Sequence, residues 1–113
     1  MGGNALRNFD SVRLDADEYH QFAEKIIGQL KTVCSGKVKE ILSYRNKPNF
    51  GDLDVLIESI DYDPKAATKA IGAVEIIRNG DVTSCGVLVS QEPFRVFQVD
   101  LISASSQEYD FAF

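Results

Sequence analysis

Hydrophobic residues recur every three or four positions after Asp15, which is the spacing of one buried helix face. The residues on this face are Tyr19, Phe22, Ala23, Ile26, Ile27, Leu30 and Val33. Asp15, Asp17 and Glu18 form a capping-box pattern with acidic residues in the first turn. Gly36 is a residue type that commonly ends helices. We therefore predict an amphipathic helix that begins after Asp15 and ends before Gly36.

Apolar and polar residues alternate, wholly or in part, over much of the remaining chain, as in half-buried strands. The predicted strands are residues 37–42, 52–58, 74–78, 82–89 and 94–102. Asn79-Gly80 is the strongest short hairpin signal, and a type I′ turn would give both residues positive φ. Glu92-Pro93 predicts a second turn, which leads into the last strand.

Three shorter stretches complete the predicted architecture. Asp63 and Pro64 cap a short Ala-rich helix that stops at Gly72. Residues 1–14 read as an irregular arm, and the segment from Ser105 begins like a helix. Strands and helices in this order predict an α+β fold, with a mixed β-sheet, helices packed on one face and the other face open.

Composition and charge limit the classes of function. Hydrophobic residues make up 44% of the chain and charged residues 26%, so we expect residues 1–113 to form a single domain, either alone or as the N-terminal part of a longer protein. No apolar run approaches the roughly 20 residues that span a bilayer, so we expect no membrane partner and a cytoplasmic location. The net charge of −5 excludes a global basic surface for nucleic acid.

The histidine and the cysteines carry little chemistry in their sequence context. His20 lies beside the apolar stripe with no second titratable group placed near it, so we read it as a partly exposed helix residue. Cys85 lies inside a predicted strand and is read as a packing residue. With Cys34 as the other cysteine, neither a disulfide framework nor a zinc cluster is implied.

Two carboxylates stand one residue apart at the start of the strand over residues 52–58. Asp52 and Asp54 share one strand face, while Leu53, Val55 and Ile57 occupy the other. Neighbouring carboxylates repel each other unless a cation lies between them, and Mg²⁺ takes oxygen ligands of this kind. An Asp-x-Asp pair is also common at solvated strand edges, so the pair by itself leaves both readings open.

A third aspartate has the correct parity to join the pair. In the last predicted strand Phe97, Val99 and Leu101 face one way, whereas Gln98 and Asp100 face the other. If the apolar residues of this strand share a core with those that follow Asp52, then Asp100 emerges on the same sheet face as the pair. The alternation therefore favours a cluster of three acidic side chains over a chance motif.

The order of these motifs resembles the polymerase-β-type nucleotidyltransferase superfamily, which includes the family X DNA polymerases and smaller relatives. The likeness rests on Ser-Tyr-Arg from Ser43, on Gly-Asp-Leu-Asp-Val-Leu-Ile from Gly51, and on Val-Asp-Leu-Ile around Asp100. The opening Met-Gly-Gly-Asn-Ala-Leu is similar to small virus-encoded members, which implies the cytoplasm of an infected host. Leu42 stands where the family has the Gly of Gly-Ser, and the loop before Gly51 is shorter than in the polymerases.

The resemblance implies a palm domain that transfers a nucleoside monophosphate from an NTP or dNTP to a hydroxyl and releases pyrophosphate. The implied cofactor is Mg²⁺ or Mn²⁺. The implied catalytic and metal residues are Asp52, Asp54 and Asp100, and the implied nucleotide-binding residues are Ser43, Arg45, Lys47 and Gly51. A nucleic-acid acceptor would be bound only weakly by this acidic chain. The alternative is a catalytically inactive palm-fold module for binding or assembly, and the departures at Leu42 and in the loop favour it.

Overall fold

The computed structural model describes residues 6–41, 49–60, 62–105, 107 and 109. Its elements are β1 (Leu14–Asp15), α1 (Ala16–Lys31), β2 (Val38–Glu40), β3 (Asn49–Phe50), β4 (Asp52–Glu58), α2 (Pro64–Ala70), β5 (Ala73–Asn79), β6 (Val82–Gln91) and β7 (Phe94–Ala104). Within this part of the chain, five strands form a sheet in the order β2-β4-β7-β6-β5, and β1 pairs with β3. Since β4 and β7 run parallel and the other pairs are antiparallel, the sheet is mixed and the α+β class is confirmed.

The amphipathic helix begins where the sequence predicts. The Asp15 side chain accepts a hydrogen bond of 2.8 Å from the Glu18 backbone N–H, which caps α1. The helix ends at Lys31, before the predicted stop, because Thr32 caps it and its hydroxyl donates to a carbonyl of the last turn. Val33, predicted on the buried face, is therefore beyond the helix and 40% exposed.

Gly36 has a different use from the one predicted. It does not end α1, which has already stopped at Lys31. A Cβ atom at Gly36 would lie 2.6 Å from the backbone oxygen of Glu58. Only glycine lets the chain pass β4 this closely on its way into β2.

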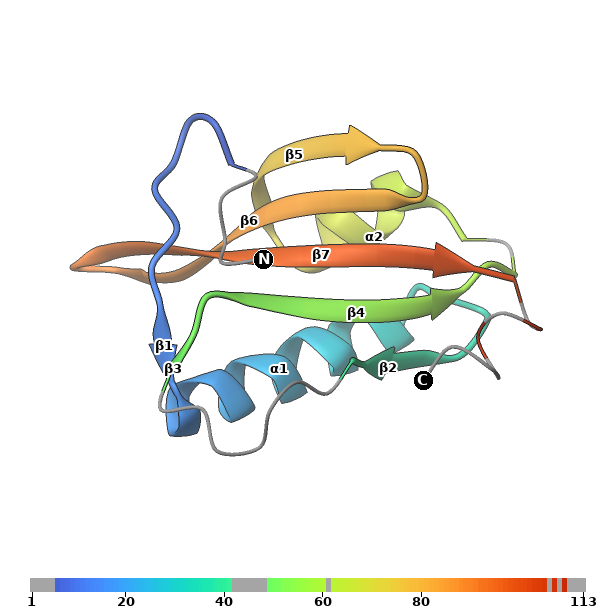
Figure 1. Ribbon diagram of the computed structural model, residues 1–113, viewed down its shortest axis with the longest axis horizontal. Helices are drawn as coiled ribbons and strands as arrows, with labels where there is room; N and C mark the ends of the chain where they lie inside the picture. Colours follow the sequence, from blue (N-terminus) through green and yellow to red (C-terminus); the bar gives the residue numbers. More distant parts are fainter. Residues whose placement is uncertain (1–5, 42–48, 61, 106, 108, 110–113) are drawn as a thin grey trace.

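The core lies between α1, α2 and one face of the sheet. Its fully buried members from β4 and β7 include Leu53, Val55, Val99 and Leu101. Both helices pack on this same cluster, and Figure 1 shows α2 behind β6 and β7. Residues on these strands therefore alternate between the core and the opposite face, as the hydrophobic pattern predicts.

The first described residues are more ordered than the predicted irregular arm. Leu14 is fully buried and pairs with Phe50 in the small β1–β3 sheet. Upstream, the Val12 backbone N–H donates to the Val96 carbonyl at 2.8 Å. Figure 1 shows this segment crossing the sheet from the β5 side towards β3. Leu14 was not assigned to the core because a two-residue strand is too short to produce a periodic pattern.

The short helix and one of the two predicted turns form where the sequence predicts, whereas the other turn is displaced. Helix α2 begins at Pro64 behind the Asp63 cap. The predicted turn between β6 and β7 forms at Glu92-Pro93, whose peptide bond is cis. The other hairpin is displaced by one residue, because Asn79 pairs with Val82. The prediction that Asn79 is a central turn residue is therefore wrong.

Two residues thus form the centre of the β5–β6 turn. Gly80 is the first of them, with a φ of +62°, and Asp81 is the second. The positive φ predicted for Gly80 is confirmed, because a left-handed conformation is easily adopted by glycine. The displacement reflects the register of β5 on β6, since the cross-strand pairs, and not the turn dipeptide alone, decide which residues close the loop.

Candidate metal centre

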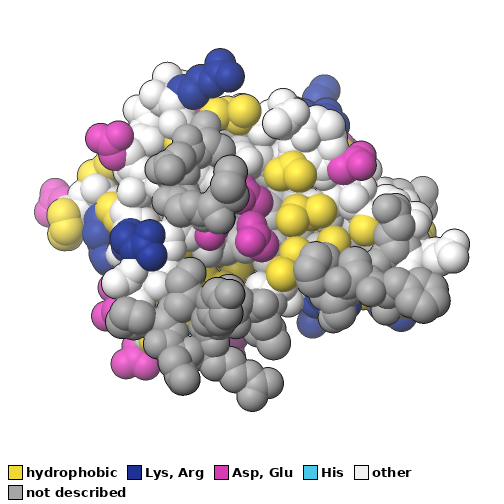
Figure 2. Space-filling view, in the orientation of Figure 1, with side chains coloured by type: hydrophobic (Ala, Val, Ile, Leu, Met, Phe, Trp, Pro, Cys, Tyr) yellow, Lys and Arg dark blue, Asp and Glu magenta, His cyan; other side chains and the backbone are white. Residues whose placement is uncertain are grey.

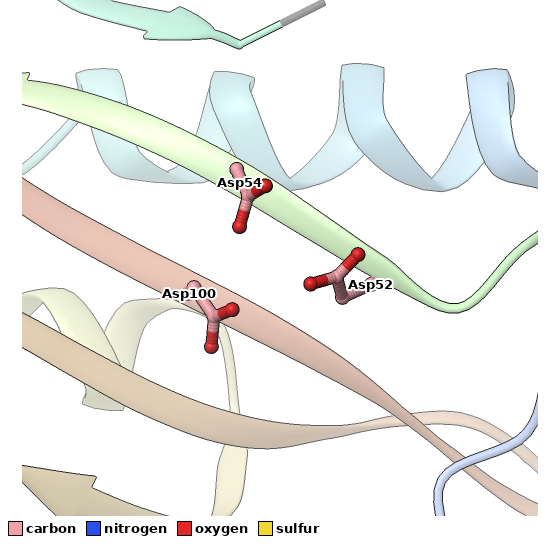
Figure 3. Close-up of side chains that lie close together, drawn as sticks. All are labelled: Asp52, Asp54 and Asp100. Carbon is pink, nitrogen blue, oxygen red and sulfur yellow. The ribbon is translucent and has the colours of Figure 1, made fainter. Parts of the chain in front are cut away.

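Three aspartates from the two central strands lie together. Asp52 and Asp54 are in β4, Asp100 is in β7, and the parallel register sets Asp54 directly beside Asp100. One carboxylate oxygen from each residue lies within 4.8 Å of one from each of the others. Figure 3 shows the three side chains converging across the β4–β7 pair. The sequence expectation that Asp100 joins the Asp52–Asp54 pair is met by this geometry.

Electrostatic repulsion within the cluster is considerable. Asp52 and Asp54 are half-buried, and Asp100 is only 8% exposed. Burial, followed by the charges of Asp52 and Asp100, raises the pKa of Asp54 to about 6. Each of these effects disfavours the ionised carboxylate. A cation between the oxygens would reverse the balance, because opposite charge at short distance favours ionisation.

A buried amide accompanies the third aspartate. Gln98 is 2% exposed and lies two residues before Asp100 on β7. Its side-chain Nε2 donates to both oxygens of Asp100, at 3.0 and 3.2 Å. In register, Gln98 lies between Asp52 of β4 and Gly86 of β6. Strand alternation places Gln98 on the same face as Asp100, but the sequence prediction gave Gln98 no part in the site. The spacing of two residues between them was the signal that could have indicated a contact.

The N-terminal segment borders the cluster on the β5 side. Glu75 lies opposite Gly86 in the sheet, and its carboxylate accepts hydrogen bonds from the backbone N–H groups of Arg7 (2.9 Å) and Asn8 (3.1 Å). A Cβ atom at Gly86 would lie 3.1 Å from a methyl carbon of Leu6. The glycine therefore leaves room for this segment beside Gln98.

The other end of the same sheet face is covered by a small apolar cluster. Leu56, Ala104 and Tyr109 are buried there, with Ile102 packed against them. The Lys39 ammonium lies 4.3 Å above the Tyr109 ring and donates to the Tyr109 carbonyl at 3.3 Å. Figure 2 shows acidic side chains near the middle of this view with hydrophobic ones beside them. The carboxylates thus lie between the N-terminal segment and an apolar surface.

Of the remaining site residues predicted from the sequence, one lies within the described part of the chain and three lie outside it. Gly51 is buried between β3 and β4, directly before Asp52. Ser43, Arg45 and Lys47 lie outside the described residues. The structure therefore brings together the predicted metal ligands, and the predicted phosphate contacts stay predictions.

The structure agrees with the predictions that His20 is a partly exposed helix residue and that Cys85 is a packing residue. His20 is exposed and makes an edge contact with Tyr19, with 5.6 Å between ring centroids. Cys85 is fully buried, and burial, followed by the charge of Asp100, raises the pKa of its thiol to about 12. A thiol with this pKa is a poor nucleophile near neutral pH, so Cys85 acts as a packing residue.

None of the helices in the described ranges is both long and apolar enough to cross a membrane. No model of a protein family matches the chain, and no curated protein matches it.

Proposed function

We propose that this chain is a metal-dependent nucleotidyltransferase with a palm fold. The supporting observation is the convergence of Asp52, Asp54 and Asp100, with oxygens within 4.8 Å of one another on adjacent strands. In the proposed reaction a hydroxyl oxygen of the acceptor attacks the α-phosphorus of an NTP or dNTP. The new P–O bond forms as the bond from the α-phosphorus to the oxygen that bridges the α- and β-phosphates breaks. Pyrophosphate leaves with that bridging oxygen, and the hydroxyl proton passes to Asp100 or to solvent.

The donor set fits Mg²⁺ or Mn²⁺. Both are hard cations that take carboxylate oxygens, and Mg²⁺ is commonly held by one or two carboxylates together with substrate phosphates. Among the described residues, the ligand group consists of three aspartates, so every ligand atom that it offers is a carboxylate oxygen. Burial, and after it the charges of Asp52 and Asp100, raise the pKa of Asp54, and a metal would relieve the repulsion between these charges.

Strand alternation supports a face dedicated to the metal. Leu53 and Val99 are buried in the core beneath α1, so the neighbouring aspartates point to the opposite side of the sheet. The view in Figure 3 agrees, with α1 behind the strands that carry the three carboxylates. We infer that this is the palm's open face, partly covered at its ends by the N-terminal segment and by Tyr109.

The roles of individual residues follow from the resemblance. Asp52 and Asp54 would hold both ions, and Asp100 would complete the ion that activates the attacking hydroxyl. When bound, two such ions stabilise the attacking and leaving oxygens. Ser43 would contact the terminal phosphates, with Arg45 or Lys47 as electrostatic support, and Gly51 would allow close approach at the start of β4.

The net charge of the chain bears on which acceptor it could bind. A net charge of −5 gives little general attraction for a phosphate backbone, so a nucleic-acid acceptor would be held weakly by this chain alone. The second candidate function is a catalytically inactive palm-fold module for binding or assembly. It is favoured by Leu42 in the place of the family's glycine and by the short loop that follows.

Pyrophosphate release tests the proposal directly. The chain is incubated with Mg²⁺ or Mn²⁺, mixed nucleotides, and in turn DNA, RNA or small hydroxyl acceptors. Wild type should release pyrophosphate, and Asp54→Asn should abolish release. Asp17→Asn, a change at an exposed helix position, is the matched control and should behave as wild type. Metal binding without any pyrophosphate release across these acceptors would instead support the inactive module.

A further inference from the structure

Gln98 is a buried polar side chain that the proposed chemistry has not yet used. Burying an amide is costly unless it is hydrogen-bonded. Its Nε2 atom donates to both carboxylate oxygens of Asp100, at 3.0 and 3.2 Å. A leucine or valine would fill the same strand position without this cost. The amide is therefore explained best by what it does to Asp100.

The sheet provides the space that this contact needs. Gln98 lies opposite Gly86 on β6, and glycine places no side chain over the amide. On its other side Gln98 lies beside Asp52 of β4. The amide can therefore extend along its own strand to Asp100, two residues away on the same face.

The contact limits the orientation of Asp100 without occupying all of its acceptor capacity. Each carboxylate oxygen has two lone pairs, so an oxygen that accepts from Nε2 can still bind a cation. The donor is neutral, so it adds no positive charge that would compete with a metal ion. A lysine or arginine at the same place would form an ion pair and repel the metal.

We propose that Gln98 is a positioning residue that holds the Asp100 carboxylate in its metal-binding orientation. This proposal rests on the proposed nucleotidyltransferase function. Partners of this kind around metal ligands typically change metal affinity or activity about 10- to 100-fold when removed. Since Asp100 would complete the ion that activates the attacking hydroxyl, loss of the Gln98 contact should lower the rate of the chemical step and leave nucleotide binding nearly unchanged.

Gln98→Met separates these effects, because methionine has a similar length but cannot donate. The probe is whichever of the four NTPs or four dNTPs gives the fastest pyrophosphate release with Mn²⁺. We expect kcat to fall about 10- to 100-fold while the KM for this nucleotide changes less than about threefold. Asp52 and Asp54, which would hold the nucleotide's ion, are themselves unchanged in this variant. Because a smaller folded fraction would also lower the apparent kcat at an unchanged KM, kcat is expressed per folded molecule, with the folded fraction taken from the unfolding curve of each variant.

Two further variants complete the design. Gln98→Glu has nearly the same shape but replaces the donor with a fourth carboxylate, so kcat should fall at least as far. Gln91→Met makes the same chemical change at an exposed position near the end of β6 and should match wild type. Thermal unfolding of each variant establishes that the compared proteins are folded.

The outcomes distinguish the two proposals. If wild type releases pyrophosphate and either folded Gln98 variant keeps a wild-type kcat, the positioning role is overturned and the nucleotidyltransferase stands. If wild type releases none, the proposed function fails. The role of Gln98 is then judged by Mn²⁺ affinity, measured from the spin-resonance signal of free Mn²⁺. A loss of roughly tenfold or more in Gln98→Met supports the role, and equal affinity, or no binding by wild type, overturns it.

Discussion

At the scale of single residues, the metal-free site is destabilising. Asp54 has a pKa of about 6 in the fold, against an ordinary value of 3.8. Between these values the folded state binds a proton that the unfolded chain has released. The contribution of Asp54 to stability is therefore largest at low pH and falls as the pH rises through about 6.

Asp54→Asn should remove this cost while abolishing metal binding. Asparagine is neutral at every pH, so without metal the variant should be more stable than wild type above about pH 6. We expect a gain of about 1 kcal/mol, well below the full value of such a shift, because solvent screens a half-exposed carboxylate. Urea unfolding in chelator at pH 4.5 and pH 7.5 measures it. If the difference in free energy of unfolding between Asp54→Asn and wild type were the same at both pH values, the raised pKa of Asp54 would be contradicted.

At the scale of elements, the β5–β6 hairpin depends on a glycine in a left-handed conformation. Gly80 has a φ of +62° and open space around its Cα, so an added side chain would meet no neighbour. The cost of a substitution is therefore one of backbone conformation alone.

Gly80→Val should destabilise the protein by on the order of 1 kcal/mol or more, since β-branched residues rarely adopt positive φ. Gly28→Ala is a useful counterpart, because Gly28 lies in α1 with nothing within 4 Å of an added Cβ. It should stabilise by roughly 0.5–1 kcal/mol. Denaturant midpoints of the two variants should move in opposite directions, and an unchanged midpoint for Gly80→Val would show that the turn has another form.

The N-terminal segment, residues 6–13, is joined to the sheet in part through one buried side chain. The carboxylate of Glu75 holds the N-terminal segment through the N–H groups of Arg7 and Asn8. Glu75 is only 8% exposed, so these charge-assisted hydrogen bonds are largely shielded from solvent.

Glu75→Ala should therefore release this segment while the sheet stays folded. Hydrogen exchange of the Arg7 and Asn8 amides should become at least about tenfold faster, because a hydrogen bond to a charged group is worth about 1.5–3 kcal/mol. Glu92→Ala, at an exposed turn position, is the control and should leave these amides unchanged. Equal protection in Glu75→Ala would mean that other contacts hold the segment.

At the scale of the whole molecule, metal binding by the three aspartates would be coupled to folding. The ligands come from β4 and β7, which are adjacent, parallel and far apart in sequence. An unfolded chain would not hold the three carboxylates together, so a metal binds the folded state preferentially. Global stability would therefore depend on the concentration of a cation that the cluster binds.

Mn²⁺ should raise the unfolding temperature of wild type but not of Asp52→Asn. At a concentration 100 times its Kd, a ligand specific for the folded state contributes about 2.7 kcal/mol. Scanning calorimetry with increasing Mn²⁺, and again after chelation, measures this shift and its reversal. The same shift in wild type and Asp52→Asn would show that Mn²⁺ binds elsewhere.

The sequence by itself determined both helices, the five strands of the larger sheet and, for β4 and β7, the side of the strand that faces the core. Period-3.6 spacing identified α1, and period-2 alternation placed Asp52, Asp54 and Asp100 opposite the buried residues, because both periods follow from backbone geometry within a few residues. The metal-ligand cluster could be expected for this reason.

Only the tertiary structure decided which elements meet and how closely. The parallel β4–β7 register set Asp54 beside Asp100, and the β5–β6 register moved the turn to Gly80 and Asp81. The tertiary structure also brings the Gln98 amide into hydrogen-bond contact with Asp100 and joins the N-terminal segment to Glu75. Such contacts join residues through cross-strand register and side-chain rotamers, which local periodicity does not encode.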